Sequence, residues 1–186
     1  AVFSEPLVEA GLDYAPFLRI GAPGVAVEAE GRELCIDGLE HGQGYELTLR
    51  EGLPARSGGQ LARSVRLEVY VRDRAASVRF PGRAYVLPAA GDLALPVETV
   101  NTDALELELM RVSDRNLVRA IRDDQLARPL SRWEDARFSE EMATEVWEGT
   151  AEIGMELNAE VTTRLPLAEV MGDLPTGVYV LRAAVP

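Results

Sequence analysis

Apolar and polar residues alternate with a period of two in several short segments of the chain. The clearest is V-R-L-E-V-Y-V-R at residues 65–72, where every second side chain is aliphatic. Residues 45–50 and 104–112 follow the same pattern, and in 104–112 leucine alternates with glutamate. Both residues favour helix by intrinsic propensity, but the period of two indicates a strand with one buried and one solvated face. This pattern is typical of antiparallel sheets that pack as a sandwich.

The same criterion predicts further strands in both halves of the chain. In the first half they cover residues 17–20, 25–29, 33–37, 45–50 and 65–72, with a tight hairpin connection at 30–32 and a surface loop at 51–60. In the second half they cover residues 77–80, 84–87, 93–100, 104–112, 145–153, 160–165 and 177–183. A chain of 186 residues suits two such modules. We therefore predict an all-β fold of two tandem antiparallel sandwiches, residues 1–74 and 75–186.

Residues 113–143 interrupt the strand pattern. Ser113 or Asp114 can cap a short helix in which Leu117, Val118 and Ile121 share one face. Pro129 would end any continuation of that helix. The following segment contains Trp133 and Phe138 among mixed charges, and we expect these two rings to anchor a long inserted loop to the second sandwich. The insertion is a helix or loop specific to this module, or a contact surface.

Composition narrows the class of partner. The chain is 47% hydrophobic and 27% charged, as in ordinary globular proteins, and no apolar run approaches the length of a membrane span. A net charge of -12 disfavours nucleic acid and anionic membrane surfaces as partners. The first residues, A-V-F-S-E-P, lack the pattern of a signal peptide, which fits a cytosolic protein or a mature or excised piece.

Few residues offer catalytic or metal-binding chemistry. Cys35 is the one cysteine and lies in a predicted strand, so a core position is favoured over a nucleophile. His41 is the one histidine and lies in a glycine-flanked loop without a second histidine to share a metal. The adjacent acidic pairs at 123–124, 134–135 and 140–141 lack the spacing of a calcium loop. We predict no enzyme, no cofactor and no metal.

Several segments together resemble one protein family. V-Y-V-R-D-R-A-A-S-V-R-F-P-G-R-A-Y-V-L-P at 69–88 and V-N-T-D-A-L-E-L-E-L-M-R-V-S-D-R-N-L at 100–117 are similar to the amino-terminal part of bacterial alpha-2-macroglobulin proteins. V-W-E-G-T at 146–150 and P-T-G-V-Y-V-L at 175–181 continue the resemblance, as do L-C-I-D-G-L at 34–39 and Y-E-L-T-L-R-E-G-L-P at 45–54.

The resemblance implies a piece of a large periplasmic inhibitor of endopeptidases, serving host defence and built from serial macroglobulin domains, each a seven-stranded sandwich. In that family a protease cuts a bait region and is trapped, and many members add a thioester from C-x-E-Q. Here Cys35 is followed by Ile36, Asp37 and Gly38, without the Glu and Gln of that motif, so no residue is assigned to a thioester. No bait segment is placed in this sequence either. The implied partners are neighbouring domains of the full-length chain and, through it, endopeptidases. The implied location is periplasmic, with a lipid anchor of the parent protein in the inner membrane as an option.

The expected role of this segment is therefore a scaffold without chemistry of its own. The seam between the two sandwiches contains Arg72, Asp73, Arg74, Arg79 and Pro81, which we expect to act as an inter-domain hinge whose angle is pinned by these residues. The main alternative is a stand-alone adhesin-like or carbohydrate-binding sandwich, with Trp133 or Trp147 stacking on a sugar and the site in residues 113–143. A hydrolase would require turnover that depends on Cys35 or His41.

Overall fold

The structure is a computed structural model that describes residues 1–82, 84–87, 93–126, 128, 130–172 and 174–186. Its chain divides into two compact units, Ala1–Arg74 and Ala75–Pro186. Each unit has strands and a hydrophobic core of its own.

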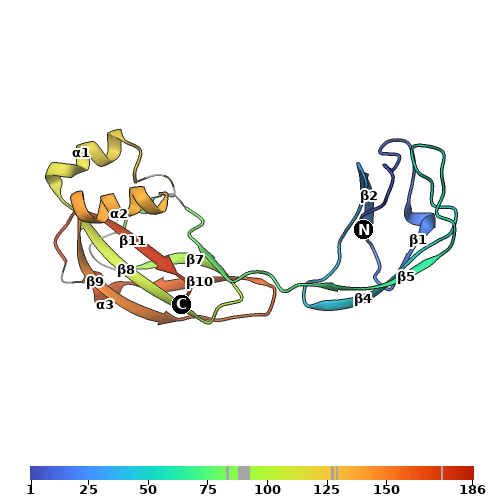
Figure 1. The fold of residues 1–186 in the computed structure, drawn as a ribbon. Helices are drawn as coiled ribbons and strands as arrows, with labels where there is room; N and C mark the ends of the chain where they lie inside the picture. Colours follow the sequence, from blue (N-terminus) through green and yellow to red (C-terminus); the bar gives the residue numbers. More distant parts are fainter. Residues whose placement is uncertain (83, 88–92, 127, 129, 173) are drawn as a thin grey trace. The chain divides into compact units, whose positions relative to one another are not determined.

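The first unit contains two antiparallel sheets (Figure 1). One has the order β1-β4-β5, formed by β1 (Leu18–Ile20), β4 (Gln43–Leu49) and β5 (Val65–Val71). The other is a hairpin of β2 (Ala26–Glu30) and β3 (Glu33–Asp37), and a 3-10 turn, η1 (Ala15–Phe17), precedes β1. Gly31 has φ 56° in the hairpin connection, a left-handed conformation that glycine adopts without steric cost. The core lies between the sheets and consists of Leu7, Tyr14, Leu18, Leu34, Leu47, Leu49 and Leu53.

The second unit pairs two three-stranded antiparallel sheets. The first sheet has the order β10-β7-β6, formed by β6 (Ser77–Arg79), β7 (Ala94–Val100) and β10 (Glu160–Pro166). The second has the order β11-β8-β9, formed by β8 (Ala104–Val112), β9 (Ala143–Glu152) and β11 (Val178–Ala184). Val97 and Leu165 from the first sheet and Leu105 and Leu107 from the second form the core between them. A short helix, α3 (Ala168–Met171), follows β10.

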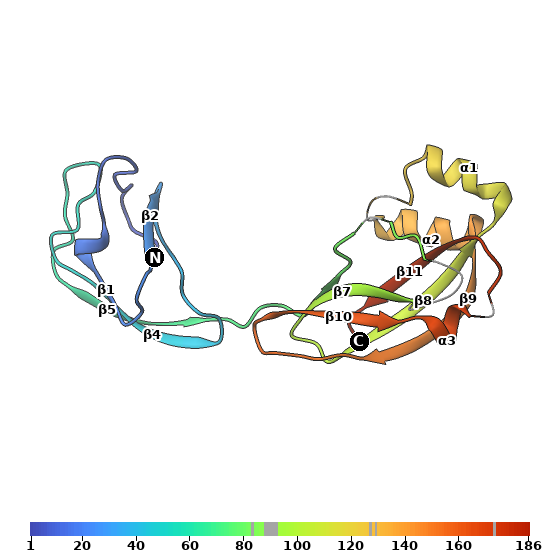
Figure 2. The same cartoon turned by 180° about the vertical axis from the view of Figure 1, so that it is seen from behind.

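Two helices between β8 and β9 add a layer to the second sheet. They are α1 (Asp114–Arg122) and α2 (Arg132–Glu141), and Figure 2 shows both beside β8, β9 and β11. Phe138 of α2 and Ala120 of α1 are 1% and 0% exposed, and they pack with Val112 at the end of β8. The helices therefore cover the end of the sheet where β8 finishes and β11 begins.

The all-β prediction with antiparallel sheets and a short helical insertion is confirmed. Residues 104–112 form β8, in which Leu105, Leu107 and Leu109 are buried, so the period of two outweighed helix propensity. The prediction of a strand at residues 84–87 is wrong, since this segment belongs to no sheet. Its side chains show why: Val86 is 98% exposed, and the Tyr85 hydroxyl folds back to accept a hydrogen bond from the Gly82 N–H at 2.7 Å.

The insertion also differs from prediction in three respects. The segment with Trp133 and Phe138 is the helix α2 and not a loop, and only Phe138 is buried, because Trp133 is 66% exposed. Val118 and Ile121 do not pack with Leu117 onto the core; they are 75% and 62% exposed. The Ser113 side chain makes no capping hydrogen bond at the start of α1. Pro129, predicted to end the first helix, lies outside the described residues.

Candidate functional site

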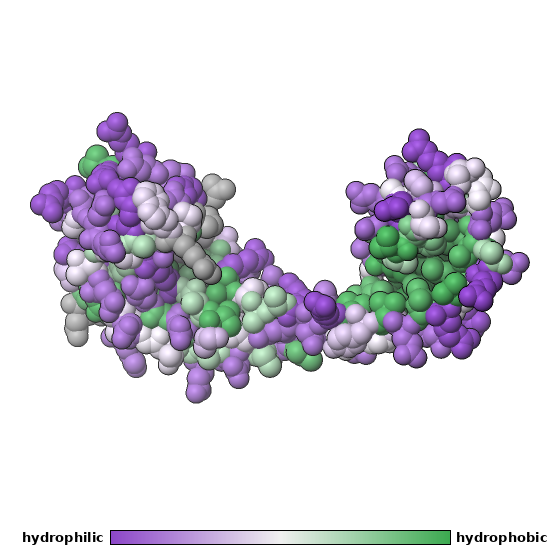
Figure 3. Space-filling view, viewed as in Figure 1, coloured by the Kyte–Doolittle hydropathy of each residue, from purple (hydrophilic) through white to green (hydrophobic). Residues whose placement is uncertain are grey.

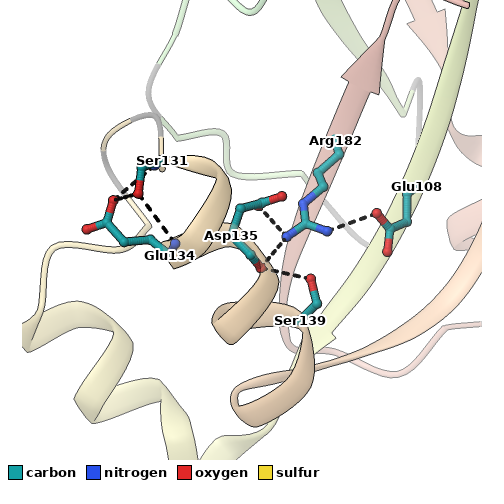
Figure 4. Close-up of polar contacts among 6 residues, drawn as sticks. All are labelled: Glu108, Ser131, Glu134, Asp135, Ser139 and Arg182. Atoms are coloured by element: carbon teal, nitrogen blue, oxygen red, sulfur yellow. Dashed lines mark hydrogen bonds and ion pairs between the residues drawn. The ribbon is translucent and has the colours of Figure 1, made fainter.

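The start of α2 is fixed by a capping box that its own sequence encodes. Glu134 returns to accept a hydrogen bond from the Ser131 N–H at 2.9 Å, and the Ser131 hydroxyl accepts one from the Glu134 N–H at 3.4 Å (Figure 4). The Arg128 guanidinium holds the same carboxylate through a contact of 3.2 Å from Nη1 and a second from Nη2. The hydrogen bond from Arg128, followed by those from Ser131, lowers the pKa of Glu134 to about 2.

A second set of polar contacts ties α2 to the sheet beneath it. Arg182 of β11 donates to the Glu108 carboxylate of β8 at 3.0 Å and to the Asp135 main-chain carbonyl of α2 at 3.1 Å, and it also forms an ion pair with the Asp135 carboxylate (Figure 4). The Ser139 hydroxyl donates to the same Asp135 carbonyl at 3.0 Å. One guanidinium therefore joins two strands and a helix, a use that suits its planar set of donors.

The two helices are joined to each other near the end of α2. The Asn116 amide donates to the Glu141 main-chain carbonyl at 2.7 Å, and the Glu141 carboxylate pairs with Arg137 at 3.2 Å and Arg119 at 3.6 Å. The hydrogen bond from Arg137 is the largest cause of a lowered pKa at Glu141. These ion pairs are partly exposed, so their contribution to stability is small compared with the burial of Phe138.

A small polar cavity of about 170 Å³ lies between α1, α2 and the segment after α1. Its walls include three arginines, three acidic residues, Gln125 and Trp133. The Arg137 guanidinium lies 4.9 Å from the centre of the Trp133 ring, a cation–π contact, and the ring remains 66% exposed. The buried Oε1 of Gln125 has no hydrogen-bond partner among the described residues. The cavity combines charged side chains with an exposed aromatic ring, whereas the Gln125 acceptor is buried and not open to solvent.

A larger cavity of about 730 Å³ in the second unit is lined by apolar groups, among them Leu95, Leu109, Leu167 and Leu181. None of the described residues that line it carries a charge. Its described lining also includes the hydroxyl-bearing residues Tyr85, Thr176 and Tyr179, so its walls are mainly apolar with some neutral polar groups.

The five predicted hinge residues belong to different units. The Arg72 carbonyl oxygen lies 2.8 Å from Nδ1 of His41, and Asp73 accepts a hydrogen bond from the Tyr70 hydroxyl at 3.4 Å, so both are engaged within the first unit. Arg74 is the last residue of that unit and is half-buried. Arg79 of β6 forms ion pairs with Glu98 at 2.7 Å and Glu160 at 3.1 Å in the second unit, where Pro81 is exposed.

The two residues considered for chemistry, Cys35 and His41, both lie in the first unit. Cys35 is half-buried in β3, and His41 lies in the turn before β4 with its Nδ1 at the Arg72 carbonyl. No group of three or more His, Cys, Asp or Glu side chains in the part of the chain that the structure describes is placed to hold a metal ion. No helix among these residues combines the length and apolar character that crossing a membrane would require.

Sequence reasoning missed the residues that fix the insertion. The S-x-x-E spacing of Ser131 and Glu134 is a recognisable local signal for a helix start. Arg182 and Asp135 are 47 positions apart, so no local pattern joins them.

Comparison with known proteins identifies relatives of both the sequence and the fold. Residues 79–184 match the family model described as the bacterial alpha-2 macroglobulin MG2 domain. The chain is 25% identical over 162 residues to an alpha-2-macroglobulin of Xylella fastidiosa strain 9a5c, covering 84% of this chain and 10% of that protein. It is 24% identical over 148 residues to the alpha-2-macroglobulin of Escherichia coli K12, covering 80% of this chain and 9% of that protein.

A crystal structure of a mutant Salmonella alpha-2-macroglobulin has the same fold over 98% of this chain, with a TM-score of 0.68 and 22% identity, and the match covers 11% of that protein. The present chain thus spans about a tenth of the length of the relatives it matches.

Proposed function

Because the chain belongs to the bacterial alpha-2-macroglobulin family, we propose that it is a non-enzymatic scaffold segment of a broad-spectrum endopeptidase inhibitor. In this proposal the longer protein traps proteases after cleavage of a bait region that lies elsewhere in its chain. The segment holds neighbouring macroglobulin domains in position and contributes neither bait nor thioester.

The observation that carries this proposal is that polar side chains attach the helical insertion to the sheet and fix its helix start. Arg182 binds Glu108 and Asp135, Glu134 caps a helix, and these contacts attach one element to another. Side chains used in this way fix the shape of a domain. A rigid domain suits a scaffold that transmits position between its neighbours.

We assign the hinge between the two units to Arg72, Asp73, Arg74, Arg79 and Pro81. The contacts of Arg72 and Asp73 with the first unit and of Arg79 with Glu98 and Glu160 support this assignment, since each end of the seam is attached to its own unit. Pro81 limits backbone freedom just after β6. We place the parent protein in the periplasm, with neighbouring domains and endopeptidases as its partners.

A protease-trapping assay tests whether inhibition requires the full-length protein and is absent from this segment alone. The segment is incubated with several endopeptidases, and protease activity on small and large substrates is followed together with electrophoretic mobility. The segment alone should leave activity unchanged and form no covalent adduct, whereas the full-length chain should protect large substrates from cleavage. Trapping by the segment alone would contradict the scaffold assignment, and a full-length chain that protects no substrate would contradict the inhibitor assignment.

One observation favours a second candidate function, carbohydrate binding. The exposed Trp133 ring borders the polar cavity, whose walls carry arginine and carboxylate side chains, and an aromatic face beside hydrogen-bonding groups suits a sugar ring. Binding on a glycan array that is lost in Trp133→Ala and kept in Val118→Ala, an exposed control on the neighbouring helix, would support it. An array without any signal would exclude it for the glycans displayed.

A further inference from the structure

The apolar cavity of the second unit has a size and shape suited to a ligand. Its volume of about 730 Å³ falls within the range of roughly 300–1,000 Å³ that is usual for small-molecule sites. Leu95 of β7 and Leu109 of β8 contribute to it from the two sheets, and residues 178–181 of β11 line it without a break. At a rise of about 3.3 Å per strand residue, the cavity therefore extends roughly 10 Å along β11.

The walls of this cavity differ in composition from the rest of the chain. Charged residues make up 27% of the sequence, yet none of the described residues that line the cavity is charged. The visible surface of the second unit is mostly hydrophilic (Figure 3), so the lining does not simply continue that surface. Apolar cavities take up apolar molecules, and one of about 150 Å³ lined by leucine, isoleucine and phenylalanine binds benzene. The composition of the walls therefore favours an aliphatic ligand.

Several aliphatic side chains on the walls are only partly covered by protein. Leu181 of β11 is half-buried, whereas Leu109, directly opposite it on β8, is 2% exposed. Met171 of α3 and Leu174 are half-buried as well, and all four of these side chains line the cavity. A ligand in the cavity would remove their remaining apolar surface from water, which favours binding.

Two hydroxyl groups lie at the exposed part of the lining. The Tyr85 hydroxyl accepts a hydrogen bond from the Gly82 N–H at 2.7 Å, and its own hydrogen has no acceptor among the described residues. The Thr176 side chain is exposed, and its hydroxyl has no hydrogen-bond partner among those residues either. The Tyr179 hydroxyl, in contrast, donates to the Pro175 carbonyl. Neutral donors at the opening suit a head group that has oxygen acceptors and no charge.

We propose that this cavity binds the aliphatic chain of a neutral single-chain lipid, a monoacylglycerol, whose head group lies at the Tyr85 and Thr176 hydroxyls. All of the described residues that line the cavity belong to the second unit, so this unit supplies the walls of the site. The aliphatic chain lies along β11, against Leu109 and Leu181. This binding is independent of the proposed scaffold function, and the protease-trapping assay does not bear on it.

Displacement of the neutral apolar fluorophore N-phenylnaphthylamine tests the site. Its fluorescence should rise on binding and saturate at one molecule per chain, and monoacylglycerols below their micelle concentrations should displace it. Each added methylene group should tighten binding about fourfold, from roughly 0.8 kcal/mol of apolar burial, until the cavity is filled and the affinity levels off. The ionised fatty acid of the same length should bind more weakly. Binding without saturation, affinity that rises at every length tested, or equal affinity for the fatty acid would contradict the proposal.

Cavity-filling substitutions locate the site. Leu181→Trp and Met171→Trp each remove room for about two methylene groups and should weaken binding about tenfold or more. Leu157→Trp is the matched control, because Leu157 is 65% exposed in the same unit and does not line the cavity. Circular dichroism identifies any variant that fails to fold, and the dependence on chain length, measured on the unaltered chain, needs no substitution. Equal affinities in the three variants would overturn the assignment, as would a full-length protein that binds no monoacylglycerol.

Discussion

Phe138→Ala should detach α2 from the sheet of the second unit. The ring is 1% exposed and packs with Val112, Ala120 and Met142. Truncation of a buried phenylalanine costs about 3–5 kcal/mol, from lost apolar burial and from the cavity that remains. The unit has 112 residues, which follows from the bounds Ala75–Pro186, and a domain of that size has a free energy of unfolding of roughly 5–15 kcal/mol. The substitution thus removes a large part of the stability of the unit.

Urea denaturation followed by tryptophan fluorescence measures this loss selectively, because both tryptophans, Trp133 and Trp147, lie in the second unit. The matched control is Trp133→Ala, an aromatic truncation on the same helix at a site that is 66% exposed. It should cost less than about 1 kcal/mol, mainly through the lost cation–π contact with Arg137. Equal losses in the two variants would refute the inference that burial of the Phe138 ring anchors the helix.

Three further predictions concern polar contacts. Glu134 has a folded-state pKa of about 2, below its ordinary value of 4.5. Its contribution to stability is therefore complete above pH 4.5 and is lost as the pH falls toward 2. Far-UV circular dichroism should show an acid transition in this range, and Glu134→Gln should remove that transition. Arg182→Met should cost about 1–2 kcal/mol in thermal unfolding and Arg182→Lys a smaller part of it, since lysine keeps the charge but loses the forked geometry. Asn101 has φ 50° and accepts a hydrogen bond from the Asn158 N–H at 2.6 Å, so Asn101→Ala should destabilise the second unit more than Asn101→Gly, as measured by urea denaturation.

The strands were predictable where one face is buried and the other is solvated. β5 shows this alternation along its full length and β8 shows it as far as Leu109, where the register shifts, and the residues of both strands follow the predicted bounds closely. Residues 84–87 have strand-like composition but no partner strand among the described residues, and pairing is a property of the whole sheet that a local segment does not encode.

The helical insertion was predictable only in part. Its position between two strands followed from the break in alternation, and the S-x-x-E spacing of Ser131 and Glu134 could have indicated the second helix. Which aromatic ring enters the core was not predictable, because Trp133 and Phe138 differ in burial through the orientation of α2 on the sheet. That orientation depends on Arg182, which is 47 positions away from Asp135.

The central position of β8 also determines the order in which the second unit opens. Both edges of β8 are paired, with β9 and β11, and its inward side chains include Leu105 at 0% exposure. The main-chain amides of β8 should therefore exchange with deuterated solvent only in global unfolding, whereas those of α1 should exchange through local opening, since Val118 and Ile121 contribute little burial to hold that helix. Helix α1 can thus open and close locally while the sheet remains folded.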